Sequence, residues 1–149
     1  MVEETESLAP SRDERTLAVL AHVLQFMTWW IGPLVIFLVR RESRFVSFHA
    51  LQALIYQGLL FVARILMMGF WFALIFTDAL VRVGRGKPSM VAPIAFVIVF
   101  GLFWVGIWAL TLVLGLVYGI KASRGEWAAY PIIGRWARRL AGINHSDQP

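Results

Sequence analysis

The segment Ser89–Ile120, SMVAPIAFVIVFGLFWVGIWALTLVLGLVYGI, runs for 32 residues without a charged side chain. About 20 apolar residues in an α-helix are enough to cross a hydrocarbon core of about 30 Å. Pro93 suits the first turn of such a helix, because a backbone N–H has no intrahelical partner there. We therefore expect a transmembrane helix over about residues 93–120.

Two further apolar stretches precede this segment. Residues 17–39 carry no charge, and Gly32-Pro33 within them predicts a kinked helix that crosses the membrane. Residues 45–80 are too long for one crossing, and their first half is amphipathic. We expect that half, about 45–57, to lie at the membrane interface as a separate helix, and about 58–80 to form the remaining span.

The ends of the chain have a different character from the apolar stretches. Residues 1–15 and 143–149 are predicted to be polar tails, the first of them disordered, with the membrane domain covering 16–142. Ser11 and Glu14 have the spacing of a capping box for a helix that begins near Arg12. An amphipathic helix at about 131–141 is expected to lie on the membrane surface.

The composition supports a membrane protein. Of the 149 residues, 59% are hydrophobic and 15% are charged, and the mean hydropathy is +0.70. A soluble chain of this length has too little interior for that much apolar surface. Because the chain has no Cys, disulfide frameworks and thiolate metal sites are excluded. The fold class expected is therefore all-α: a polytopic membrane protein with about three transmembrane helices plus amphipathic interfacial helices.

The basic residues predict an orientation and the partners. Three spans place the 40–48 loop and the C-terminal tail on one side with eight Lys and Arg, against five on the other side. The positive-inside rule then predicts a multi-pass protein of the plasma (inner) membrane, with the N-terminus outside and the C-terminus cytoplasmic. The net charge of +5 is attributed to these flanks, so lipid is the expected partner and nucleic acid is not.

Two histidines, His22 and His49, are candidate metal ligands by residue type. With three spans, His22 and His49 lie near opposite membrane faces, about 25 Å apart by helix rise. A shared zinc site is then excluded, and neither His has Cys, Asp or Glu nearby in sequence to complete a site. The sequence carries no signature of an enzyme active site, so we expect no catalytic residue, no cofactor and no metal.

A polar stripe is the most informative local feature. His49, Gln52 and Tyr56 share one face of an otherwise apolar helix, and Arg64 lies further along it. Polar side chains in such a place are costly unless they are satisfied, so this face either packs internally, lines a hydrated groove, binds headgroups or meets a partner. A second group of basic residues is expected to contact lipid headgroups: Arg40, Arg41, Arg44, Arg135, Arg138 and Arg139.

Part of this pattern resembles a known family. The run Phe45-Val46-Ser47-Phe48-His49-Ala50-Leu51-Gln52-Ala53-Leu54, with the later Tyr130-Pro131, resembles the bacterial relatives of the twenty-kilodalton Tic subunit of the chloroplast inner-envelope translocon. The resemblance implies an all-helical membrane domain, and in the plastid branch a part in protein import within a larger complex. It implies no catalytic residue.

The resulting expectation is a small non-enzymatic integral membrane protein of the Tic-like kind. It would serve as an accessory or structural subunit of a membrane complex, with other membrane proteins or a second copy as partners. The alternative is a small transport or channel component that works as an oligomer, with the polar stripe lining its path. A third hypothesis is an enzyme that acts on lipid, but the sequence shows no acid–base constellation that would support it.

Overall fold

The computed structural model describes residues 9–83, 91–131 and 133–142 of the chain. The described residues form five α-helices and no strand, so the all-α prediction is confirmed. The expected tail residues 1–8 and 143–149 lie outside the described residues, as do residues 84–90 and 132. In chain order the helices are α2 (Arg12–Thr28), α3 (Ile31–Val39), α4 (Arg44–Val83), α5 (Val91–Ser123) and α6 (Ile133–Leu140).

The start of α2 follows the capping prediction. The Ser11 hydroxyl accepts a hydrogen bond from the Glu14 backbone N–H, and the Glu14 carboxylate accepts one from the Ser11 N–H at 2.8 Å. These two bonds satisfy backbone donors that a helix otherwise leaves without partners at its N-terminus. Glu14 also accepts a hydrogen bond from Ser43, which ties the beginning of α2 to the turn before α4.

The first predicted span, 17–39, is wrong as a single helix. The helix ends at Thr28, and Trp29 adopts a positive φ of 56°, so the chain turns back before α3 begins. Gly32 fits this corner because a Cβ there would overlap Leu24 and Thr28, and Pro33 sits in the first turn of α3. Gly32-Pro33 therefore starts a new helix instead of kinking an existing one.

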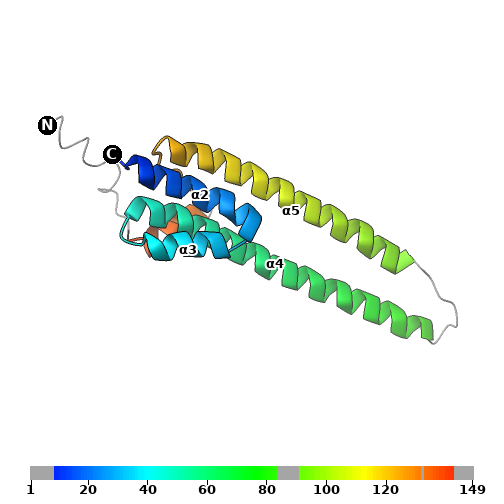
Figure 1. Cartoon of the computed structure of the whole chain (residues 1–149). Coiled ribbons are helices and arrows are strands. Elements are labelled where there is room, and N and C mark those ends of the chain that lie inside the picture. The colour runs from blue at the N-terminus through cyan, green and yellow to red at the C-terminus, as the bar shows by residue number, and fades with distance from the viewer. Residues whose placement is uncertain (1–8, 84–90, 132, 143–149) are drawn as a thin grey trace. The chain divides into compact units, whose positions relative to one another are not determined.

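α3 packs back on α2 and forms a helical hairpin (Figure 1). Ile36 and Phe37 of α3 lie against Ala21 of α2, in a cluster that also takes in Val46 and Ala50 of α4. α2 has 17 residues and α3 has nine, which correspond to about 25 Å and about 13 Å. Neither helix is long enough to cross a hydrocarbon core of about 30 Å by itself.

α4 is one continuous helix of 40 residues, so the separate interfacial helix expected over 45–57 is also wrong. The helix continues through Gly58, where an added Cβ would meet nothing within 4 Å. The polar side chains of its first half do not need water, because protein groups surround them. By length and composition two helices qualify as membrane spans among the described residues, Arg44–Arg82 and Pro93–Ser123, instead of the three expected.

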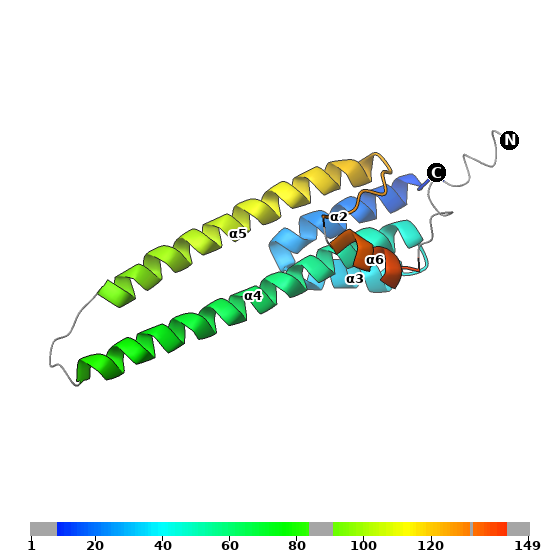
Figure 2. The same cartoon turned by 180° about the vertical axis from the view of Figure 1, so that it is seen from behind.

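The last two helices agree better with the sequence prediction. α5 covers the expected span at 93–120 with Pro93 in its first turn, and the chain leaves it through Gly125 at a φ of 79°. α6 falls within the interfacial helix expected at 131–141. Its residue Arg138 has its guanidinium 5.9 Å from the ring centre of Phe48, so α6 lies against the first part of α4 (Figure 2).

The described chain divides into two units. The first unit contains residues 9–58, 111–131 and 133–142, and the second contains 59–83 and 91–110. In the first unit Ala18, Phe45 and Ala122 form a second small core where α2, α4 and α5 meet. Six alanines are buried in this unit, and such small side chains let helices approach closely and bring their polar side chains within bonding distance.

Candidate functional site

A pair of buried histidines lies at the centre of the first unit. His22 Nε2 of α2 is 3.0 Å from His49 Nδ1 of α4, and both side chains are fully enclosed. The expected separation of about 25 Å is therefore wrong. The expected distance assumed that α2 crosses the membrane. Instead, the chain reverses direction in the α2–α3 hairpin, and α2 lies beside the start of α4.

The hydrogen bonds around this pair run in one direction. His49 Nε2 lies 3.2 Å from the carbonyl oxygen of Glu126, which only accepts, so in the neutral ring Nε2 carries the proton and Nδ1 accepts. His22 Nε2–H then donates to His49, and His22 Nδ1 accepts from the Tyr130 hydroxyl at 3.0 Å. Gln25 Nε2 donates a hydrogen bond to the Tyr130 hydroxyl oxygen, and this is the first bond in the row of hydrogen bonds.

Burial keeps this chain of hydrogen bonds uncharged. Burial and the neighbouring His49 lower the pKa of His22 from 6.5 to about 3, so the imidazole is neutral near pH 7. Burial likewise raises the pKa of the Tyr130 hydroxyl, against a smaller opposing effect of the hydrogen bond from Gln25. Every ring nitrogen of the pair already has a hydrogen-bond partner.

Gln52 joins α4 to the loop that follows α5. Its side-chain amide donates to the carbonyl of Ala128 at 3.2 Å and accepts from the N–H of Tyr130. One glutamine thus satisfies two backbone groups of a loop that has no regular partner, and it fixes Tyr130 next to His22. We call His22, Gln25, His49, Gln52 and Tyr130 the histidine network.

The expected polar stripe is divided between the two units. His49, Gln52 and Tyr56 are all buried in the first unit, where the Tyr56 hydroxyl lies 3.0 Å from Thr111 Oγ1 of α5. Arg64 belongs to the second unit, and its guanidinium sits 4.7 Å from the centre of the Trp104 ring. The structure therefore brings three of these four residues together and leaves Arg64 with a separate aromatic partner.

The six arginines expected at headgroups all belong to the first unit. Five of them are exposed, and Arg138 is partly covered by its contact with Phe48. On α6, Ile133 and Ala137 face inward while Trp136 and Leu140 are exposed, so the helix still offers apolar side chains beside its arginines. The exposed residues are Arg40, Arg41, Arg44, Arg135 and Arg139.

Sequence reasoning missed His22, Gln25 and Tyr130 as members of one site. A signal was present, because His22 and Gln25 are separated by three positions in one helix, as His49 and Gln52 are in another. Residues three apart share a helix face, so two matching polar pairs in apolar helices predict that the faces meet. The contribution of Tyr130 has no such local pattern.

The network is suited to hold helices together and less suited to bind a metal ion. Among the described residues, no group of three or more His, Cys, Asp and Glu is placed to hold a metal ion. The rings of Phe45 and Phe48 pack on His49, the nearer with its centroid 4.7 Å from that of the imidazole, and Trp127 packs on both phenylalanines. Packing and hydrogen bonds enclose both imidazole rings, while the Gln25 side-chain oxygen is buried without a hydrogen-bond partner.

The family of the chain follows from a comparison of its sequence with known families. The magnetosome magnetite crystal formation protein family (MamF/MmsF) matches residues 13–137, which is most of the chain. The chain belongs to this family, and it is a membrane protein. No curated protein and no solved structure matches it.

This membership corrects two predictions. The assignment to the Tic-like family is wrong, because the family that matches over most of the chain is the magnetosome one. The expected functions, an accessory subunit of the import type or a transport component, are overturned by the same match. The motif that suggested them, Phe45–Leu54, is the segment that carries His49 and Gln52, so it reflects packing in the first unit.

Proposed function

We propose that this member of the family acts in a magnetosome membrane, where it supports the formation of magnetite crystals. The observation that carries the proposal is the family match over 13–137, which includes nearly all of the five described helices. We further propose that its role there is non-enzymatic. The histidine network supports this, because the ring nitrogens of its two histidines bond to each other, to Tyr130 and to the backbone.

Both described ends of the chain are proposed to lie on one membrane face, in place of the opposite faces expected from three spans. Two spans in sequence return the chain to its starting side, and the Ser43 hydroxyl donates to Glu14 at 2.6 Å. Ten of the fourteen Lys and Arg lie in residues 12–15, 40–44 and 121–139, whereas three lie in 82–87. This bias favours a cytoplasmic location for the ends, with the end of α4 at Val83 and the start of α5 at Val91 on the other side.

Lipid is the proposed main partner, together with other membrane proteins or a second copy of the chain. Supporting this, the second unit exposes large apolar side chains such as Phe61, Leu66 and Phe76 over more than half of their surface. In water such a surface associates or aggregates. The exposed arginines of the first unit are proposed to contact anionic headgroups, and a role in nucleic-acid binding is not proposed.

The function is tested by replacing the family member of a magnetite-forming bacterium with this chain. We expect electron micrographs to show crystals restored in size and number relative to a strain with an empty vector. The Gln52→Leu variant, which leaves two buried backbone groups without partners, should restore them poorly, and Asp78→Asn should restore them fully. Crystals that stay defective while the intact chain is present in magnetosome membranes would refute the proposal.

The topology is tested by single-cysteine labelling, since the parent has no Cys. Glu42→Cys and Arg135→Cys should react with an impermeant maleimide from the cytoplasmic face, and Gly86→Cys from the opposite face. Labelling of positions 42 and 135 from different faces would rule out the two-span arrangement, whatever the role in crystal formation.

A further inference from the structure

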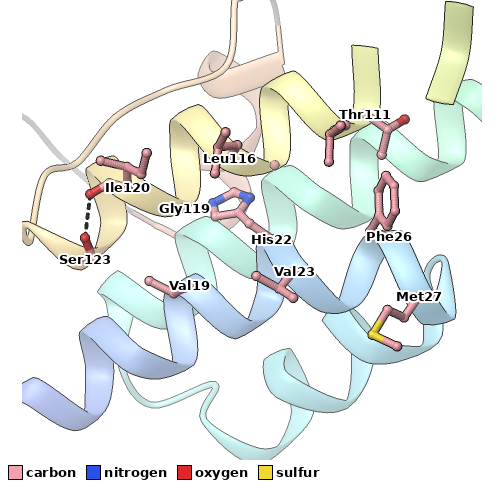
Figure 3. A pocket seen from close by; sticks show the side chains of 12 residues that line it. Val19, His22, Val23, Phe26, Met27, Thr111, Leu116, Gly119, Ile120 and Ser123 are labelled. Carbon is pink, nitrogen blue, oxygen red and sulfur yellow. Dashed lines mark hydrogen bonds between the residues drawn. The ribbon is translucent and has the colours of Figure 1, made fainter. Parts of the chain in front are cut away.

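A cleft runs along the outside of the first unit between α2 and α5. Its volume is about 380 Å³, within the range of pockets that hold small ligands (Figure 3). α2 contributes Val19, Val23 and Met27 to its walls, and α5 contributes Leu116 and Ile120. These walls are apolar, so the cleft suits a hydrocarbon chain better than a polar ligand.

The cleft exists because two glycines of α5 face α2. A Cβ on Gly115 would lie 3.2 Å from the carbonyl oxygen of His22, so α2 approaches α5 closely at this point. One turn further along α5, a Cβ on Gly119 would meet only the His22 Cβ at 3.9 Å, which leaves an open floor. The rim residues Met27 and Leu116 are exposed over 77% and 62% of their surface. In a bilayer such a rim contacts lipid tails.

A basic pocket continues the cleft toward the start of α2. Arg12, Arg15 and Thr16 line it, and it shares Val19 and Ser123 with the apolar cleft, so the two form one surface. Arg15 is held in place because its Nε donates to the carbonyl of Pro10 at 2.8 Å. Guanidinium groups bind phosphate through paired N–H donors.

The acidic residues near this pocket do not neutralise it. The two carboxylate oxygens of Glu14 accept hydrogen bonds from Ser11 and Ser43. No ion pair joins Arg12 or Arg15 to a carboxylate in the part of the chain that the structure describes. The basic end is therefore complementary to an anion that is attached to an apolar chain.

We propose that this surface is a binding site for an anionic phospholipid. Its phosphate lies against Arg12 and Arg15, and one acyl chain follows Val19 and Val23 over the floor at Gly119. The site is distinct from the six arginines expected at headgroups, and it goes beyond the proposed function, since it does not depend on a role in crystal formation. The occupant is a single bilayer lipid, because the head and tail pockets are continuous.

The test uses the full chain in nanodiscs of phosphatidylcholine that contain phosphatidylglycerol with a photoreactive group on one acyl chain. After illumination we expect mass spectrometry to place the adducts on residues 19–27 and 112–123. Unlabelled phosphatidylglycerol should compete for the adduct, and glycerol phosphate, which has the headgroup without a tail, should not. If glycerol phosphate by itself abolishes the adduct, the site binds free phosphate and the proposal is overturned.

Charge variants test the basic end of the site. Arg12→Gln with Arg15→Gln should reduce the adduct by about tenfold, because both proposed phosphate contacts are lost. Arg40→Gln with Arg41→Gln removes the same charge from another exposed position and should reduce the adduct by less than about threefold. Equal reduction in the two double variants would identify general attraction to a basic surface, which contradicts a defined site.

Cleft-filling variants test the acyl end. Gly119→Leu should abolish the adduct at residues 112–123, whereas Gly106→Leu on the same helix should leave it unchanged, since nothing lies within 4 Å of that position. Val23→Trp fills the cleft from its exposed rim and provides the same test if Gly119→Leu does not fold. An unchanged adduct in folded Val23→Trp or Gly119→Leu would refute seating of the acyl chain in the cleft.

Discussion

Both units expose large apolar side chains, and the first unit exposes arginines as well, but the larger difference lies in their interiors. The first unit buries seven polar side chains among its described residues, including His22, His49 and Gln52. In the second unit, Ile107 is the one buried residue among the described positions. Its two helix segments meet through aromatic contacts, with Trp71 of α4 against Phe96 of α5 and Arg64 of α4 over the Trp104 ring of α5.

This difference separates two ways of building a membrane protein. Lipid tails pack on apolar side chains as well as other side chains do, so burial of apolar surface adds little to helix association in a bilayer. The first unit instead gains specificity from hydrogen bonds that have no competing water. The second unit leaves large apolar side chains such as Phe61, Leu66 and Phe76 exposed, and we expect it to tolerate substitution better than the first unit.

The largest effect is expected when the histidine network loses Gln52. Gln52→Leu leaves the Tyr130 N–H and the Ala128 carbonyl buried without partners, which should lower the free energy of unfolding by about 2–4 kcal/mol. In the second unit, Thr77→Val removes only a bond to its own helix and should cost less than about 0.5 kcal/mol. Equal losses in detergent unfolding curves would remove the distinction between the units.

Acid should destabilise the first unit through His22. In the unfolded chain this side chain binds a proton below pH 6.5, but in the folded chain it does so only near pH 3. The unfolded state thus binds more protons between these values, and stability falls as the pH falls, by about 2 kcal/mol at pH 5. Unfolding midpoints between pH 7.5 and pH 5 should fall less steeply for His22→Gln, and parallel slopes would contradict this origin.

Two glycines should respond to alanine in opposite directions. Gly32→Ala places a Cβ against Leu24 and Thr28 at the hairpin corner, so we expect a loss of about 1–3 kcal/mol. Gly101→Ala in the second unit meets nothing within 4 Å and should stabilise its helix by up to about 1 kcal/mol. Thermal unfolding in the same detergent checks both, and destabilisation by Gly101→Ala would indicate a contact at that face.

The smallest effect is expected at the ion pair between Asp78 and Arg82, one turn apart on α4. Both side chains are about 30% exposed, so Asp78→Asn should cost about 0.5 kcal/mol or less. The cost should shrink further in high salt, since exposed pairs are screened. If Asp78→Asn instead lowers the free energy of unfolding by much more, and the loss does not depend on salt, the pair is buried. That result would contradict the exposed surface described for the second unit.

The histidine network shows how far sequence reasoning reached. The costly polar stripe of His49, Gln52 and Tyr56 was detectable, because a helix with period 3.6 places them on one face. The residues that bond to this stripe could not be predicted from the sequence, because the network joins His22 to Tyr130 across 108 positions of the chain. The error at residues 17–39 arose because an apolar run of that length fits one crossing helix as well as a hairpin.

The sequence by itself determined that the protein is an α-helical membrane protein. It also determined where the last span begins and how α2 is capped, since these depend on composition and on residues within one turn of each other. Only the tertiary structure decided that residues 17–39 form a hairpin and that two histidines meet. Such contacts depend on backbone reversals, here at Trp29 and Gly125, and a reversal changes every distance beyond it without changing the hydropathy of the sequence.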